Sequence, residues 1–251
     1  MKKLFLVACL CALLAGCANN NGANSNGSEN GEAASAETTT AASADTIRKF
    51  DIAKLEWTRQ PKDCVISNDT IKITTAPGTD LWQRTYYHFR NDNAPVLQMK
   101  TAQKYFSFVV KTDFAESHHR FDQCGVVLYL DSENWLKGSI EYENEQFQHL
   151  GSVVTNHGYS DWATTEIPAD VKSMWYRLSR RGDDFCIECS DDGITFRQMR
   201  VCHLNEAKDV ISFGIYACSP EESSFTATFT NMAMTDCKWL AHDGQKPDDV
   251  Q

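Results

Sequence analysis

The feature that most constrains the fold is a succession of short runs in which apolar and polar residues alternate. From Lys62 onward the runs are separated by turn residues such as DSEN and DDG, and they include IKITT, YFSFVVKTDF, CGVVLYL, WLKGSIEY, FQHLGSVVT, DFCIECS, VISFGIYAC and FTATFTNMAM. No segment carries an amphipathic helical stripe of ten or more residues. Strands at this spacing are typical of antiparallel sandwiches and barrels. We therefore predict an all-β jelly-roll sandwich of two antiparallel sheets, since about a dozen strands exceed the immunoglobulin number.

One hairpin, from Asp122 to Glu143, allows a prediction of register. If DSEN is its turn, Leu130 pairs with Trp135, and each face of the hairpin then carries seven side chains. The face predicted to look into a groove or solvent holds Cys124, Val126, Leu128, Trp135, Lys137, Ser139 and Glu141. The face predicted to be core holds Gly125, Val127, Tyr129, Leu136, Gly138, Ile140 and Tyr142.

The beginning of the chain, MKKLFLVACLCALLAGCANN, reads as a secretory signal, with two lysines, an apolar run and small residues before a cysteine. Its LAGC ending resembles the bacterial lipobox, which implies that residues 1–17 are a lipoprotein signal and that Cys17 is the lipid attachment site. Residues 18–45 contain only Ala, Asn, Gly, Ser, Thr, Glu and Asp, so we expect a disordered linker. We assign 46–240 to one β-sandwich domain and 241–251 to a loose C-terminal tail.

Charge and cysteine content exclude some functions. The net charge is −10, and the 22 basic and 30 acidic residues after position 45 give −8, which argues against nucleic acid as a partner. Seven cysteines follow Cys17, and an odd count leaves at least one thiol free even where export permits disulfides. Cys186 and Cys189 are three apart on a predicted strand, so they point to opposite faces and do not predict a zinc or redox CxxC site.

Five motifs in one order resemble a known family. They are TDLWQRTYY (79–87), FDQCGVVLYLDSENWLKGSIEY (121–142), SVVTNHGYSDWA (152–163), FCIECSDDGITFRQMR (185–200) and FGIYACSP (213–220). Together they resemble the domain-of-unknown-function 1349 family, also labelled regulation-of-enolase-like, over about residues 50–236. The resemblance implies a concanavalin A-like lectin/glucanase fold, in agreement with the strand pattern. It implies no established activity, because a fold does not determine a function.

Polar and aromatic residues alternate on three predicted strands, which places them on shared faces. A sugar ring offers C–H faces for stacking on indole rings and hydroxyls for charged side chains, so the pattern suits a glycan site. The opposing interpretation is that the tryptophans pack a sheet edge while the charges form structural ion pairs. The candidate ligand-binding residues are Asp80, Trp82, Arg84, Asp122, Trp135, Lys137, Glu141, Asp161 and Trp162.

Metal ligands are not fixed by any spacing in the sequence. His118 and His119 are adjacent in a polar loop without a third ligand, whereas zinc needs three or four converging ligands. Carboxylates such as Asp122 and Asp131 in predicted loops would suit calcium, but they do not form a calcium-loop motif. We predict no metal site and no cofactor, with calcium as the ion the loops would suit best.

The segment SIEYENEQF decides between an enzyme and a binding protein. Glu141, Glu143 and Glu145 have the spacing of the E-x-D-x-E strip in laminarinase-like glycoside hydrolases, and alternate carboxylates on a strand could converge for retaining catalysis. Beyond Tyr142, however, the alternate positions are Asn144 and Gln146, so the core face stops. ENEQ is therefore predicted to be a hairpin tip, with Glu141 as the only deep carboxylate and the other two in water.

These observations predict an exported, membrane-anchored domain of the bacterial cell envelope that binds carbohydrate or a glycoconjugate without catalysis. One alternative is a glycoside hydrolase or lyase that uses Glu141 with Asp80, Asp122 or Asp161. Another is a protein-interaction domain whose tryptophans are buried against an envelope partner. The sequence leaves the ligand, the leaflet and the oligomeric state open.

Overall fold

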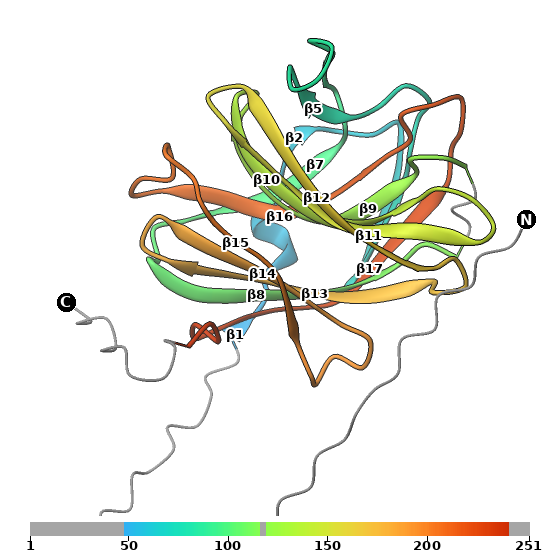
Figure 1. Cartoon of the computed structure of the whole chain (residues 1–251). Coiled ribbons are helices and arrows are strands. Elements are labelled where there is room, and N and C mark those ends of the chain that lie inside the picture. Colours follow the sequence, from blue (N-terminus) through green and yellow to red (C-terminus); the bar gives the residue numbers. More distant parts are fainter. Residues whose placement is uncertain (1–47, 116–118, 241–251) are drawn as a thin grey trace, which may run out of the picture. The chain divides into compact units, whose positions relative to one another are not determined.

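The computed structural model describes residues 48–115 and 119–240, which form two large antiparallel sheets stacked face to face (Figure 1). The predicted all-β sandwich is confirmed. Among the described residues the only helix is the short 3-10 turn η1 (Ile52–Lys54), and none is long and apolar enough to cross a membrane. Cys17, the linker 18–45, the tail 241–251 and His118 lie outside the described residues.

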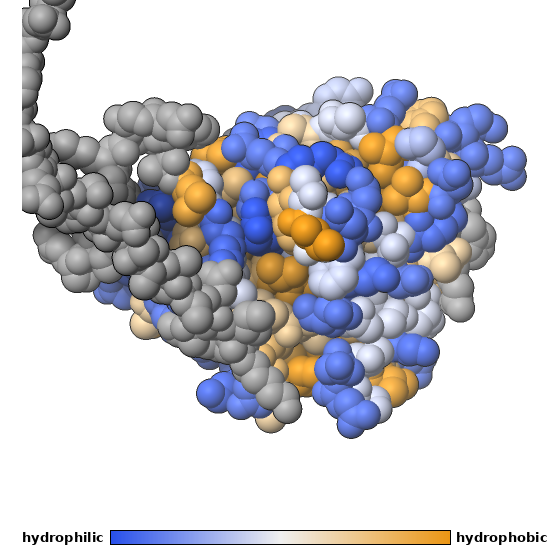
Figure 2. Space-filling view, turned by 90° about the horizontal axis from the view of Figure 1, so that it is seen from below, coloured by the Kyte–Doolittle hydropathy of each residue, from blue (hydrophilic) through white to orange (hydrophobic). Residues whose placement is uncertain are grey.

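The eight-stranded sheet has the order β15-β14-β13-β8-β17-β4-β3, with β1 pairing on β17. Its strands are β1 (Arg48–Lys49), β3 (Asp63–Ser67), β4 (Thr70–Thr74), β8 (Tyr105–Asp113), β13 (Ser173–Arg181), β14 (Asp184–Ser190), β15 (Arg197–His203) and β17 (Thr226–Thr235). Figure 2 looks at the molecule from below, the side of this sheet in Figure 1, and its uncovered part is largely hydrophilic with small separate apolar patches. Apolar side chains scattered in this way are normal for a protein surface.

The seven-stranded sheet has the order β12-β11-β10-β9-β16-β7-β2. Its strands are β2 (Glu56–Arg59), β7 (Val96–Thr101), β9 (Gln123–Asp131), β10 (Asn134–Tyr142), β11 (Phe147–Asn156), β12 (Tyr159–Pro168) and β16 (Ile211–Cys218). The predicted hairpin tip is confirmed, because β10 ends at Tyr142 and β11 begins at Phe147.

The main core lies between the two sheets and is rich in aromatic rings. Phe106 and Phe108 of β8 pack on Phe213 of β16, with ring centroids 4.7 and 5.1 Å apart. These rings are fully buried, and tilted aromatic pairs at such distances add to the free energy of burial. This packing holds the seven-stranded sheet in place and leaves its other face available for a second layer.

A small hairpin covers part of that other face. Strands β5 (Leu81–Gln83) and β6 (Arg90–Asp92) pair only with each other, and β5 lies above the seven-stranded sheet, away from the eight-stranded one (Figure 1). Leu81 forms a second apolar cluster with side chains of the sheet that include Val127, Trp135 and Tyr216. The middle of the sheet is therefore buried on both faces, which explains the almost continuous burial along β9, β10 and β16.

Polar contacts fix the hairpin to the sheet. The hydroxyl of Tyr129 donates to Asp92 at 2.7 Å and accepts from Arg59 at 3.2 Å. Arg59 also stacks over the Tyr129 ring, with its guanidinium carbon 4.7 Å from the centroid. These three residues belong to three different strands, so they tie β6 to both β2 and β9.

The predicted register of the β9–β10 hairpin is wrong by one residue. An irregularity between Asn134 and Trp135 shifts the ladder, so that Trp135 pairs with Tyr129 in place of Leu130. Cys124, Val126 and Leu128 consequently belong to the core between the sheets, with Leu136 and Ile140. The partners of Trp135, Lys137 and Glu141 on the outer face are Tyr129, Val127 and Gln123. A β-bulge has this effect because an extra residue on one strand exchanges the faces of the strand beyond it.

All seven cysteines of the described residues are free. Cys189 belongs to the core between the sheets, whereas Cys186 lies outside that cluster, as positions three apart on a strand require. Burial raises the pKa of the Cys186 thiol to about 12. Because the thiolate is the reactive form of cysteine, this pair has the properties of inert structural residues.

Candidate functional site

A pocket of about 800 Å³ opens on the outer face of the seven-stranded sheet. Its floor comes from β9 and β10, and β5, the segment before β6 and β12 form a wall in which Trp82 and Trp162 contact each other. The residues that line it are Asp80, Trp82, Thr85, Tyr86, Tyr87, Phe89, Phe121, Gln123, Lys137, Glu141, Val153, Ser160, Asp161, Trp162, Pro220 and Glu221. Six of these are aromatic and five are charged, which is the mixture expected of a ligand site.

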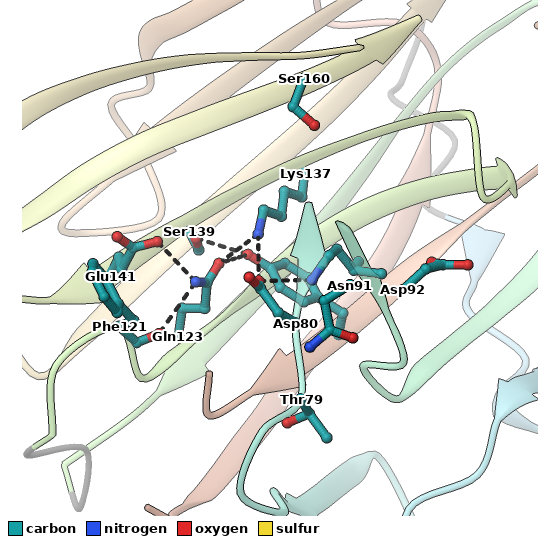
Figure 3. A network of polar contacts seen from close by, with 12 residues as sticks. Thr79, Asp80, Asn91, Asp92, Phe121, Gln123, Lys137, Ser139, Glu141 and Ser160 are labelled. Carbon is teal, nitrogen blue, oxygen red and sulfur yellow. Dashed lines mark hydrogen bonds and ion pairs between the residues drawn. The ribbon is translucent and has the colours of Figure 1, made fainter. Parts of the chain in front are cut away.

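The floor of the pocket is a chain of four polar side chains (Figure 3). The ammonium of Lys137 donates to Oε1 of Gln123 at 2.9 Å and lies 3.6 Å from a carboxylate oxygen of Asp80. The amide nitrogen of Gln123 donates to Oε2 of Glu141 at 2.8 Å and to the carbonyl of Phe121 at 3.2 Å. The oxygen and the nitrogen of the Gln123 amide both have hydrogen-bond partners, so the orientation of the amide is fixed. Gln123 therefore lies between Lys137 and Glu141 and links them.

Lys137 is only 3% exposed, and aromatic rings compensate part of its desolvation. Its ammonium lies 5.7 Å from the centroid of Trp135 and 5.5 Å from that of Tyr216, which are distances for cation–π attraction. The hydroxyl of Tyr216 is within 2.9 Å of Gln123 Oε1 and 2.8 Å of the Ser139 hydroxyl. The lysine is therefore a rigid part of the floor.

Glu141 is a pocket carboxyl group whose pKa is raised toward neutrality. Burial raises its pKa to about 7. The positive charge of Lys137 is the largest opposing influence, the negative charges of Asp80 and Glu143 add to the rise, and the Gln123 hydrogen bond lowers the pKa slightly. Its neighbour across the strand pair on β11 is His149. With a pKa of about 7 this carboxyl group exchanges its proton close to neutral pH, so it can act as a donor or as an acceptor of a hydrogen bond.

Two indole rings lie in the wall of the pocket. Trp82 and Trp162 approach edge to face with centroids 6.4 Å apart, and Trp162 is 44% exposed. The Trp82 ring nitrogen donates to the carbonyl of Thr85 at 3.0 Å. His149 also packs edge to face against Trp162, with centroids 5.8 Å apart. Both indoles are held by these contacts while keeping surface toward the pocket.

The rim between β5 and β6 is aromatic and conformationally strained. Tyr86 is 82% exposed and Tyr87 is 66% exposed, and their rings are 4.8 Å apart. Both residues have positive φ, and so do Arg84 and His88. Bulky side chains rarely adopt this conformation, and such strain persists only where surrounding contacts impose it.

Arg84 supplies contacts of that kind. Its guanidinium forms two hydrogen bonds with Glu133, at 2.8 and 2.5 Å, and a third with the carbonyl of Gly158 at 2.9 Å. Gly158 has φ +75°, and a Cβ there would lie 1.6 Å from Nη1 of Arg84. The guanidinium therefore fills the space that the missing side chain leaves, and it anchors the rim loop to the β9–β10 and β11–β12 turns.

The structure brings together six of the nine residues predicted from the sequence. Asp80, Trp82, Lys137, Glu141, Asp161 and Trp162 line the pocket. Asp161 is also paired with Arg200 of β15, at 2.8 Å.

The other three predicted residues lie elsewhere. Arg84 anchors the rim loop through Glu133 and does not line the pocket. Trp135 is 0% exposed and belongs to the apolar cluster beneath the hairpin, so the prediction that it faces a groove is wrong. Asp122 is also buried, at 1% exposure, and its carboxylate accepts from the Ser223 hydroxyl at 2.6 Å. The alternation of the strands gives no sign of the β5–β6 layer that covers Trp135, nor of the segment whose Ser223 contacts Asp122.

The expectation that Glu143 and Glu145 both lie in water is half wrong. Glu145 is exposed at the hairpin tip. The Glu143 side chain is only 16% exposed and pairs with Arg120 at 2.9 Å, with His149 at 4.0 Å. Glu143 reaches Arg120, before β9, and His149, on β11, because the turn of the hairpin begins only after residue 143.

Several lining residues were not predicted from the sequence. Tyr86, Tyr87 and Phe89 belong to the run TYYHF, whose closely spaced aromatic residues were the available signal. Gln123, Phe121 and Glu221 carried no such signal, because they reach the pocket only through the fold. Among residues 48–115 and 119–240 no group of three His, Cys, Asp or Glu side chains could hold a metal ion.

Similarity to known proteins extends along most of the chain. "Regulation of enolase protein 1" of Saccharomyces cerevisiae is 28% identical over 188 residues, which are 75% of this chain and 92% of the yeast protein. A crystal structure of a functionally unknown protein from Saccharomyces cerevisiae matches with a TM-score of 0.69 and 26% identity, over 74% of this chain and 98% of that one.

More distant structures share the fold only. The GH43 BlXynB protein from Bacillus licheniformis matches with a TM-score of 0.56 and 16% identity, over 73% of this chain and 36% of that chain. The xylan beta-1,4-xylosidase from Bacillus halodurans C-125 matches with a TM-score of 0.54 and 13% identity, over 73% and 39% of the two chains. The family described as "Protein of unknown function (DUF1349)" matches residues 57–237, and the chain therefore belongs to this family.

Proposed function

We propose that this domain binds carbohydrate in the pocket on the seven-stranded sheet, without chemical conversion of the ligand. The observation that carries the proposal is the combination of Trp82 and Trp162 in the wall with the Asp80–Lys137–Gln123–Glu141 chain in the floor. Indole rings stack on the C–H faces of sugars, and fixed polar groups select the positions of hydroxyl groups. A volume of about 800 Å³ is in the range of small-molecule sites and suits a short oligosaccharide.

The floor is prepared for hydroxyl groups before the ligand arrives. Lys137 has three N–H donors, of which one is used on Gln123, and its ammonium forms an ion pair with Asp80 at 3.6 Å. Glu141 has acceptor capacity beyond its contact with Gln123. Because these side chains are already ordered by burial and hydrogen bonds, little conformational entropy is lost when they bind a sugar.

A glycan array probed with the purified protein and its Trp82→Ala and Trp162→Ala variants tests this proposal. Each substitution should weaken retention of the best ligand at least about tenfold, as the loss of one stacking partner predicts. Trp175→Ala is the matched control, because Trp175 is a partly exposed tryptophan of the eight-stranded sheet outside the pocket. Retention unchanged in both pocket variants, with the fold intact by circular dichroism, would contradict the proposal.

A glycoside hydrolase or lyase is a second candidate, which the raised pKa of Glu141 favours. A carboxyl group with a pKa of about 7 holds its proton near neutral pH, as a general acid must. The pocket offers Asp80 and Asp161 as further carboxylates, but the first is paired with Lys137 and the second with Arg200. Product release from a polysaccharide panel that disappears in Glu141→Gln would establish this candidate, and equal activity of parent and variant would exclude Glu141 as the acid.

We further propose that the domain is exported and held at the bacterial cell envelope by a lipid on Cys17. The support is the sequence alone: the basic start, the apolar run and the LAGC ending. Metabolic labelling with a radioactive fatty acid should mark the wild-type chain and leave a Cys17→Ser variant unlabelled. Equal labelling of both would contradict the anchor.

A further inference from the structure

The acidic side chains that line the pocket are not equally neutralised. Two of them each have a cationic partner: Asp80 with Lys137 at 3.6 Å and Asp161 with Arg200 at 2.8 Å. Glu221 lies 3.4 Å from the imidazole of His119, which is a cation only when protonated. The carboxylate of Glu141 accepts only from the neutral amide of Gln123, at 2.8 Å. Within the described part of the chain, no lysine, arginine or histidine nitrogen lies within 4 Å of it.

The one cationic side chain that lines the pocket, Lys137, does not neutralise Glu141. Lys137 is 3% exposed and is shared between Asp80, Gln123 and two aromatic rings beneath it. Asp80 and Asp161 are paired with Lys137 and Arg200, so the uncompensated negative charge of the lining comes from Glu141 and Glu221. A uronate or a sulfated sugar would bring a further negative charge into this pocket.

The aromatic rings of the pocket favour positive charge as well. Phe121 already has the guanidinium of Arg120 over its face, 4.4 Å from the centroid. In the described structure no cation lies over Trp82, Trp162, Tyr86, Tyr87 or Phe89, the other five rings of the lining. The face of an aromatic ring is electronegative, and indole and phenol faces attract ammonium groups more strongly when water is excluded.

We propose that the ligand of this pocket is a cationic carbohydrate, an amino sugar with a free ammonium group that pairs with Glu141 in the pocket that Trp82 and Trp162 line. The inference rests on the proposed function and specifies its ligand class. A neutral hydroxyl or acetamido group at the same position would leave Glu141 without a counter-charge. An ammonium group supplies the charge-assisted hydrogen bond that no side chain of the described protein provides.

If the ligand is a cation, its binding should release protons from the protein, which the binding of a neutral ligand would not do. Asp80 and Glu143 oppose ionisation of Glu141, Lys137 favours it, and His149 faces it from the adjacent strand. With its pKa near 7, the carboxyl group of the free protein is partly protonated at neutral pH. A ligand cation beside it lowers that pKa, so binding at pH 7 should release a fraction of a proton from Glu141.

Three β-1,4-linked tetrasaccharides that differ only at C2 test the proposal: those of glucosamine, N-acetylglucosamine and glucose. Isothermal titration at pH 7 should give about tenfold or tighter affinity for the glucosamine tetramer, the effect of one charge-assisted hydrogen bond. Glu141→Gln should reduce that preference to less than about twofold. Glu145→Gln is the matched control, since it removes the same charge from the exposed tip of the same hairpin and should leave the preference intact. A permanently charged trimethylammonium derivative, titrated at pH 7 in buffers of different ionisation enthalpy, should show proton release in the wild type and none in Glu141→Gln.

A glycan array that presents each backbone in free-amine, N-acetylated and uronate forms separates the possible failures. Binding of neutral or uronate glycans without preference for free amines would overturn this inference and leave the proposed function standing. An equal preference for glucosamine in wild type and Glu141→Gln would also overturn it. Absence of binding to every glycan would overturn both.

Discussion

At the scale of single residues, Glu141 shows how position determines chemistry. It has the same side chain as Glu143 and Glu145, yet only Glu141 faces the pocket, because β10 ends one residue after it. Burial raises its pKa to about 7, while Glu143 pairs with Arg120 and Glu145 is exposed at the tip. The repeated glutamates of the sequence therefore have three different environments.

The raised pKa of Glu141 predicts a pH-dependent stability. Because the folded protein holds this proton and the unfolded chain loses it above its ordinary value of 4.5, the free energy of unfolding should fall as pH rises from about 4.5 to 7. Glu141→Gln removes this cost, so its stability relative to wild type should increase by about 2–3 kcal/mol between pH 5 and pH 8. Urea unfolding at both pH values measures the change, with Glu145→Gln as the control that should show none. A difference between Glu141→Gln and wild type that is independent of pH would be contrary to this account.

Gly158 provides a second test at the residue scale. An alanine there would combine a positive φ with a Cβ 1.6 Å from Arg84 Nη1, so Gly158→Ala should lower the free energy of unfolding by about 2 kcal/mol or more. Gly182→Ala is the matched control, since Gly182 also has positive φ but no atom within 4 Å of an added Cβ. Chemical unfolding of both variants isolates the effect of displacing Arg84. Equal losses in the two would show that the Arg84 anchor contributes little.

At the scale of elements, the fold was more predictable from the sequence than the site. Alternation and turn residues identify most strands, including the ends of β10 and β11, because each strand face meets either core or solvent. The register of β9 and β10 was not predictable, since the irregularity at Asn134 and Trp135 leaves no mark in a pattern of alternating apolar residues. The pocket was partly predictable: alternation placed Trp82 and Lys137 on the correct faces, but it could not show that the β5–β6 hairpin covers Trp135.

Trp82 and Trp135 should therefore respond differently to truncation. Trp135→Ala empties a fully buried site and should lower the free energy of unfolding by about 3–5 kcal/mol. Trp82→Ala removes a partly exposed pocket wall, so it should cost less stability and more affinity. Thermal unfolding and glycan retention, measured on both variants, separate the two roles. If Trp82→Ala were the more destabilising substitution, the assignment of Trp135 to the core beneath the pocket would be wrong.

At the scale of the whole molecule, the core between the two sheets provides stability, while the outer face of one sheet and the added β5–β6 hairpin form the proposed binding site. The sheets enclose the aromatic core, while the outer face of the seven-stranded sheet holds the polar floor under β5 and β6. This arrangement is achieved with all seven cysteines of the domain unpaired, and four of them are fully buried. Stability therefore rests on packing and hydrogen bonds.

The thiols can be counted directly. In protein whose Cys9, Cys11 and Cys17 have been replaced by serine, a thiol reagent should find seven reactive groups after unfolding without reductant. In the native state Cys124, Cys186, Cys189 and Cys218 should not react, because they are buried and their thiol pKa values are raised. Five or fewer thiols after unfolding would reveal a disulfide that the structure does not contain.

The location of the ligand is the central claim, and nuclear magnetic resonance of the six tryptophan indole N–H groups tests it most directly. Titration with the best glycan of the array should shift the indole signals of Trp82 and Trp162, which line the pocket, and leave that of Trp175 on the other sheet unchanged. Shifts at Trp175 with unchanged signals from Trp82 and Trp162 would place binding elsewhere and contradict the account.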